Sequence, residues 1–274
     1  MPDFQTLKTR AEGAVLFAEI DSPPLNMIGP GLVSDLVSLI ELLDQGEPYR
    51  VVVFSSADPD FFIAHVDVTR IAEYREAAAK LTGEASLGLM FRRLSETKAV
   101  TIAQIAGRTR AAGSEFVLAC DMRFASRERA VFGQIEAGTG LAPGAGAMQH
   151  LARLMGRGRA LEVLLSATDF DADTAERYGW INRALPDGDL APFVAALAER
   201  IARFPLEGLM AIKERINAVT LADAADFRTD SDLFGALVRE PAAQRRMALL
   251  LKSGMQTRGV TELNFGQVLG EIED

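Results

Sequence analysis

Apolar residues fall into two patterns along the chain, continuous runs typical of buried strands and spaced positions typical of helices. Residues 51–54 read V-V-V-F, which predicts a strand buried on both faces, and residues 14–20 and 99–105 also read as strands. Residues 31–43 place leucines and one isoleucine at helical spacing, which predicts an amphipathic helix. This order of strand, helix and strand predicts a mixed α/β chain with parallel strands.

The remaining pattern predicts more helices than strands. Residues 61–68 read as a loop, in which Asp67 is placed to cap a helix that begins near Val68. A boundary is expected near residues 205–220, and the chain after Leu221 is helical in composition but ends in glycine-punctuated sequence. Short strands are expected at residues 121–125, 130–132 and 181–184, and helices at residues 70–96 (with a break at Thr82–Gly83), 116–120, 147–155, 157–165, 171–178, 190–202 and 205–217.

Composition narrows the functional class. The chain has 274 residues, of which 49% are hydrophobic and 24% charged, a composition typical of a globular protein with a sizeable core. Its net charge of −9 argues against a nucleic-acid partner. No apolar run is long enough to span a membrane, and the start M-P-D-F-Q does not resemble a signal peptide, so we expect a cytoplasmic protein that does not bind membranes.

The thiol and imidazole side chains do not predict a metal site. Cys120 is the only cysteine, which excludes an internal disulfide, and its apolar neighbours predict a buried structural thiol. The two histidines, His65 and His150, are far apart in sequence, so we expect no metal centre built from cysteine and histidine. The chain also lacks the G-x-S-x-G, G-x-x-x-x-G-K-[ST] and G-x-G-x-x-G motifs.

The segment from Gly107 to Glu136 carries the strongest chemical signal. Small residues at positions 111–113 suit a tight turn that feeds a helix, and free N–H groups at such a turn can hold an oxyanion. Glu115 lies at the start of the apolar segment and Glu136 follows F-G-Q-I, so two acids beside this turn indicate an acid/base site. The alternative is structural, because nearby arginines could simply pair with Glu115.

Four blocks of sequence resemble the crotonase, or enoyl-CoA hydratase/isomerase, superfamily. They are R-V-V-V-F with F-I-A-H-V-D-V, then A-G-R-T-R-A-A-G-S-E-F-V-L-A-C-D, then F-G-Q-I-E with G-L-A-P-G-A-G-A-M-Q-H-L, and finally A-L-E-V-L-L-S-A-T-D-F-D-A-D-T-A-E-R-Y-G-W-I-N-R-A. The second block is similar to the family pattern N-G-x-A-x-G-G-G-x-E-L-A-L-A-C-D. Together the blocks cover roughly residues 26–217 in the family's order.

The resemblance implies an architecture and a ligand. It implies an α/β fold, a crotonase-type spiral of ββα turns over residues 1–205, with a helical C-terminal region at residues 206–274 that forms a homotrimer or hexamer. It also implies an acyl-CoA substrate, with coenzyme A as part of the substrate and no separate cofactor or metal. By matching positions, the oxyanion hole would be formed by the backbone N–H groups of Ala64 and Ala112.

The resemblance further implies a lyase that hydrates an α,β-unsaturated thioester. Glu115 would activate water and Glu136 would protonate the α-carbon, and the expected substrate pocket is His65, Asp67, Gly113, Ile135 and Gly144. His65 replaces the glycine of the family loop, Ala111 and Ala112 replace glycines, and Ile135 replaces the usual proline. Two alternatives remain: an isomerase or other enolate chemistry, and a weakly active protein that binds CoA thioesters.

Overall fold

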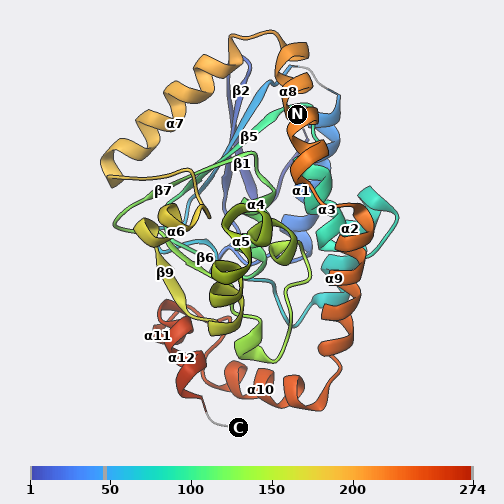
Figure 1. Ribbon diagram of the computed structural model, residues 1–274, viewed down its shortest axis with the longest axis vertical. Helices are drawn as coiled ribbons and strands as arrows, with labels where there is room; N and C mark the ends of the chain where they lie inside the picture. The colour runs from blue at the N-terminus through green and yellow to red at the C-terminus, as the bar shows by residue number, and fades with distance from the viewer. Residues whose placement is uncertain (1, 46–47, 273–274) are drawn as a thin grey trace.

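Two β-sheets carry the fold, and the chain passes repeatedly from one to the other (Figure 1). The structure, a computed structural model, describes residues 2–45 and 48–272. The six-stranded sheet has the order β1-β2-β3-β5-β7-β10 and the four-stranded sheet the order β4-β6-β8-β9. The strands are β1 (Leu7–Glu12), β2 (Val15–Ile20), β3 (Val51–Ser56), β4 (Phe61–Ile63), β5 (Val100–Ile105), β6 (Arg108–Arg110), β7 (Met122–Ser126), β8 (Val131–Gly133), β9 (Asp169–Asp171) and β10 (Arg183–Leu185).

Helices follow the strands and dominate the second half of the chain. They are α1 (Pro30–Asp44), α2 (Ile71–Thr82), α3 (Leu87–Ser95), α4 (Ala112–Ala119), the 3-10 turn η1 (Ala137–Thr139), α5 (Ala147–Ser166), α6 (Ala172–Tyr178), α7 (Asp187–Ala202), α8 (Leu206–Thr220), α9 (Ala224–Leu237), α10 (Pro241–Lys252), α11 (Val260–Leu263) and α12 (Phe265–Glu271). The predicted break at Thr82–Gly83 is confirmed, because Gly83 adopts a left-handed conformation with φ 76° and ends α2.

The predicted spiral of ββα turns is confirmed. The pairs β3–β4, β5–β6 and β7–β8 each place one strand in the large sheet and the next in the small sheet, and each pair is followed by helical structure. Within the large sheet β3, β5 and β7 pair in parallel, and within the small sheet β4, β6 and β8 do the same. Each turn of the spiral therefore stacks on the previous one.

Strand β3 is buried on both faces, as its continuous apolar sequence predicts. Val52 and Phe54 belong to the main core with helices α1 to α5, whereas Val51 and Val53 pack on the opposite face against α7. All four are at most 1% exposed. The large sheet thus lies between α7 on one side and the remaining core on the other.

Three strands of the small sheet were not predicted. β4, β6 and β9 have three residues each, too short to show an alternating pattern. The cap expected at Asp67 is also wrong, because α2 begins only at Ile71 and Asp67 Oδ1 instead accepts from Thr69 N–H (3.0 Å). Residues 64–70 remain an ordered loop that leaves β4.

The helices after residue 205 return to the body of the protein. Lys213 of α8 is buried and donates to Ala99 O (2.7 Å) and to Asp121 Oδ2 (2.9 Å). Helix α9 packs along α3, α10 contacts η1, and α12 reaches β9, so Figure 1 shows the orange and red helices passing along one side and under the molecule. Whether residues 206–274 form a separate domain stays a prediction.

Two smaller predictions concern burial and membranes. Cys120 is 3% exposed, and burial raises the pKa of its thiol to about 12, so the prediction of a buried structural thiol is confirmed. In the part of the chain that the structure describes, no helix combines the length and the apolar character needed to cross a membrane.

Gly113 serves packing rather than the substrate pocket. A Cβ at this position would lie 2.4 Å from Ile63 O and 2.8 Å from the Ile63 Cβ. The missing side chain lets the first turn of α4 approach β4 directly, which brings the central helix and the loop after β4 together. Gly113 does not line the cavity described below.

We expect Gly113→Ala to destabilise the protein by about 1–3 kcal/mol, because a backbone oxygen cannot move aside as a flexible side chain can. Thermal unfolding would measure the loss. The matched control is Gly158→Ala, since Gly158 is an exposed glycine of α5 whose added Cβ would meet nothing within 4 Å. The control should be neutral or slightly stabilising, and equal melting temperatures for both variants would contradict the close approach.

Candidate active site

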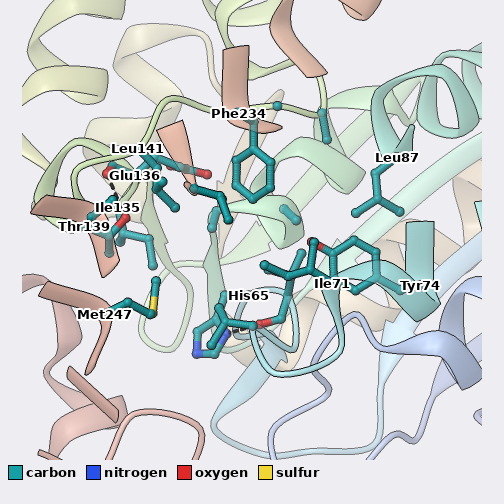
Figure 2. A pocket seen from close by; sticks show the side chains of 18 of the residues that line it. His65, Ile71, Tyr74, Leu87, Ile135, Glu136, Thr139, Leu141, Phe234 and Met247 are labelled. Carbon is teal, nitrogen blue, oxygen red and sulfur yellow. Dashed lines mark hydrogen bonds between the residues drawn. The ribbon is translucent and has the colours of Figure 1, made fainter. Parts of the chain in front are cut away.

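A cavity of about 320 Å³ lies between the central segment and the C-terminal helices (Figure 2). The loop after β4, the start of α4 and the segment from Ile135 to Ala145 form one part of its wall. Phe234, Met247 and Leu251 from α9 and α10 form another part. The wall is mainly apolar with a few polar groups, which is the usual make-up of a small-molecule site.

Glu115 is buried at the start of α4 and is held by the start of α5. It is 2% exposed, and its Oε1 accepts from the N–H groups of Ala145 (2.7 Å) and Ala147 (3.1 Å). Burial raises the pKa of Glu115 to about 7, although these two backbone hydrogen bonds favour the charged form. Glu115 can therefore exist in either protonation state near neutral pH.

Glu136 lines the same cavity and is 6% exposed. Gln134 Nε2 donates to its Oε2 (3.1 Å). Burial raises the pKa of Glu136 well above its ordinary value, and the charge of Glu115 raises it further. Because both carboxyl groups line one cavity and the charge of one raises the pKa of the other, they titrate as a pair.

A strained turn presents the N–H group of Ala112 at the cavity. Ala111 has φ 47° and ψ −125°, a conformation that non-glycine residues rarely adopt. Ala112 is the first residue of α4, so its N–H has no acceptor within the helix. Among the described residues no other acceptor bonds it, and both alanines line the cavity.

The structure does not support Ala64 as the second oxyanion donor. Its N–H donates to Leu25 O (3.3 Å), and its side chain packs in a small cluster with Leu25 and Phe61. Val66, two residues further on, lines the cavity instead, and within residues 2–45 and 48–272 its N–H has no acceptor. The predicted loop is therefore in place, but the free N–H group belongs to Val66.

His65 is engaged at both ring nitrogens. Nδ1 lies 2.7 Å from Val66 O, and Nε2 lies 2.9 Å from Oε1 of Glu262, which comes from α11. Both side chains are buried. Burial raises the pKa of Glu262, but the hydrogen bonds from His65 and from the N–H of Gln256 help to outweigh it, so the pKa lies below its ordinary value. His65 thus orients the loop and has no ring nitrogen left for a substrate.

Gln256 forms a second link between the C-terminal segment and this loop. Its Oε1 accepts from Val68 N–H (2.8 Å), and its Nε2 donates to Asp67 Oδ1 (2.9 Å). Its own N–H donates to Glu262 Oε1 (2.6 Å). Asp67 thus helps to hold the loop in place. The prediction that it lines the substrate pocket is wrong, because it is not part of the cavity lining.

The cavity gathers most of the predicted site residues. Ala64, Asp67 and Gly113 lie outside its lining. The predicted residues that do line it are His65, Ala112, Glu115, Ile135, Glu136 and Gly144. Among the residues that the structure describes, no group of three histidine, cysteine, aspartate or glutamate side chains is placed to hold a metal ion.

Val66 and the residues that the C-terminal segment brings to the site were not predicted from the sequence. The loop F-I-A-H-V-D-V indicated the region, but which N–H stays free depends on the pairing of residues 64–67 with Leu25 and Ile28. Glu262 and Gln256 lie nearly 200 positions after their loop partners, at separations of 197 and 188–189 residues. Sequence periodicity carries no signal for such contacts.

The chain is similar in sequence to a known family of proteins. The sequence pattern of the family described as "Enoyl-CoA hydratase/isomerase" matches residues 10–253. The chain is 28% identical to the short-chain-enoyl-CoA hydratase of Clostridium acetobutylicum over 207 residues, which cover 75% of this chain and 78% of that protein.

Solved structures show the same similarity. A crystal structure of a Streptomyces avermitilis protein, described as a candidate enoyl-CoA hydratase, has a TM-score of 0.98 and 55% identity over 100% of this chain and 99% of that one. DspI of Pseudomonas aeruginosa has a TM-score of 0.72 and 28% identity, with 92% and 95% of the two chains covered. The chain belongs to the enoyl-CoA hydratase/isomerase family, the crotonase superfamily.

Proposed function

We propose that the protein adds water across the double bond of an α,β-unsaturated acyl-CoA. The observation that carries the proposal is the pair of buried carboxyl groups, Glu115 and Glu136, facing one cavity beside two free backbone N–H groups. Hydration needs a base for water, an acid for the α-carbon and a site for the enolate oxygen. The cavity offers each of these.

The N–H groups of Val66 and Ala112 are the proposed oxyanion hole. Both are free among the described residues and belong to residues that line the cavity. The thioester oxygen would gain negative charge as hydroxide adds to the β-carbon, and fixed N–H donors stabilise that charge without reorganising. The bonds of His65 and Gln256 to residues 66–68 hold the first donor in place.

The pKa shifts support a division of labour between the acids. Burial and the charge of Glu115 raise the pKa of Glu136 well above its ordinary value, which favours the protonated form that can deliver a proton to the α-carbon. Glu115, with a pKa of about 7, is partly ionised at neutral pH and can take a proton from water. Glu115 takes one proton from water and Glu136 gives one proton to the α-carbon. When the hydrated product forms, Glu115 is therefore protonated and Glu136 is ionised.

We expect Glu115→Gln and Glu136→Gln each to lower the rate of hydration by about 10²–10⁴, since each change keeps the shape of the side chain but removes proton transfer. Loss of absorbance by the conjugated thioester would report the rate. Glu199→Gln, on the exposed side of α7, is the matched control and should leave the rate unchanged.

The pattern of losses separates the possible activities. The double variant should lose less than the product of the two single losses, because the two groups act as a unit. Activity that survives Glu115→Gln but not Glu136→Gln would point to an isomerase that shuttles a proton through one acid. Full activity in both variants would make the acids structural and remove the hydratase proposal.

The pH dependence of kcat/KM should be bell-shaped. As the pH increases toward neutral, kcat/KM should rise because Glu115 loses its proton around its pKa of about 7. As the pH increases further, kcat/KM should fall because Glu136 is deprotonated. The apparent pKa values belong to the coupled pair. Glu115→Gln should remove the acidic limb, and a flat profile between about pH 6 and pH 8 would contradict the assignment.

We also propose that α8 packs against a second copy of the chain, in a trimer or hexamer. Ile212, Ile216 and Val219 are 66%, 58% and 76% exposed and recur along one side of the helix. A contiguous apolar stripe of this kind is typical of an interface.

Ile216→Glu should therefore lower the molar mass measured by light scattering, because a charge would enter the apolar contact. Val260→Glu provides a control at an exposed apolar residue of α11, where the side chain is 74% exposed. A monomeric parent protein at micromolar concentration would refute the assembly.

A further inference from the structure

The hydroxyl group of Tyr74 has no partner, although the side chain is buried. Tyr74 belongs to α2, is 1% exposed and lines the cavity. In the described part of the chain no donor or acceptor bonds its hydroxyl, and because this oxygen is not one of the fully enclosed atoms without a partner, it opens on the cavity and can meet a ligand. The other polar side chains of the lining each have at least one contact, namely His65, Thr69, Arg75, Glu115, Glu136, Thr139, Ser231 and Gln244.

Tyr74 lies across the cavity from the Glu136 side. Figure 2 shows Tyr74 with Ile71 and Leu87 on one side of the space, and Glu136 with Thr139 and Leu141 on the other. An acyl chain whose reacting carbons lie near Glu136 would therefore extend toward Tyr74. Most of the lining is apolar, and Arg75 and Glu115 are the charged neighbours of the hydroxyl.

Arg75, the next residue, adds a guanidinium group. Its Nε donates to Ala85 O (2.7 Å), and its Nη2 lies 3.5 Å from Ser231 Oγ. No carboxylate of residues 2–45 or 48–272 forms an ion pair with it. Arg75 lines both the cavity and the neighbouring surface groove, in which Glu76 and Asp232 also lie without pairing to it.

The two side chains together favour an anionic oxygen ligand. Burial raises the pKa of Tyr74, so its hydroxyl stays protonated at neutral pH and can donate. A guanidinium group binds carboxylates with charge-assisted hydrogen bonds. A methyl-ended acyl chain would satisfy neither group, because it has no acceptor.

We propose that Tyr74 and Arg75 form a recognition site for a carboxylate at the far end of the acyl chain, so that the preferred substrates are enoyl-CoA thioesters of dicarboxylic acids. The inference rests on the proposed hydratase function only for the placement of the thioester end. The Tyr74 hydroxyl donates a hydrogen bond to one carboxylate oxygen. Arg75, which lines both the cavity and the neighbouring groove, supplies the opposite charge.

The test compares pairs of enoyl-CoA substrates of equal chain length that end in a methyl group or in a carboxylate. The parent protein should show a kcat/KM about tenfold or more higher for the carboxylate-ended member at one or more lengths. Tyr74→Phe and Arg75→Gln should each lower this ratio by about 10–100-fold, because each removes a hydrogen bond to a charged group.

Matched controls use the same substitutions outside the cavity. Tyr178→Phe removes an exposed hydroxyl that bonds Glu162, and Arg153→Gln removes an exposed guanidinium that bonds Gln149. Neither residue lines the cavity, so both variants should keep the parent ratio. A parent that prefers the methyl-ended member at every length, or a Tyr74→Phe variant with the parent ratio, would overturn the proposal.

Binding separates this inference from the proposed reaction. Saturated acyl-CoA thioesters with the same two chain ends cannot be hydrated, and calorimetry would give their affinities. A preference for the carboxylate-ended thioester that disappears in Tyr74→Phe would support the recognition site even if no hydration occurred. Equal affinities for both ends in the parent protein would refute the recognition site even if hydration were fast.

Discussion

The burial of two carboxyl groups against one cavity is the constraint on which the rest of the site depends. A buried carboxylate is costly unless it is hydrogen-bonded, so Glu115 requires the N–H groups of Ala145 and Ala147, and these fix the start of α5 against α4. The same burial raises the pKa of Glu115 to about 7 and raises the pKa of Glu136 well above its ordinary value. The packing of α4 on α5 and the proposed acid/base chemistry therefore have one physical origin.

The C-terminal segment completes the site from the same chain. The buried pair of His65 and Glu262 and the bonds of Gln256 attach this segment to the loop that carries the free Val66 N–H. Removing one member of such a pair would leave the other buried without its partner, which is strongly destabilising. The histidine that replaces the glycine of the family loop thus has a structural partner far away in sequence, and the two together hold the donor in position.

Much of the fold could be predicted from the sequence, because its signals are local. The run V-V-V-F predicted β3 buried on both faces, and the small residues before Glu115 predicted the turn at the start of α4. The choice of Ala64 failed because the pairing with Leu25 decides which N–H group stays free. Gly113 was placed in the pocket by the family resemblance, whereas in the structure a Cβ added there would lie 2.4 Å from Ile63 O, which shows that the glycine serves packing. Tyr74, Gln256 and Glu262 carry no sequence signal, since their roles depend on contacts made in three dimensions.

In the proposed reaction a water molecule is added across the double bond, and one acid acts on the water while the other acts on the α-carbon. The most direct measurement is mass spectrometry of the product formed from an enoyl-CoA in heavy water. We expect a product that has gained the elements of water, with a single solvent deuteron bonded to the α-carbon and a hydroxyl group on the β-carbon. A product of unchanged composition with a shifted double bond, or recovery of the unaltered thioester, would contradict the proposed reaction.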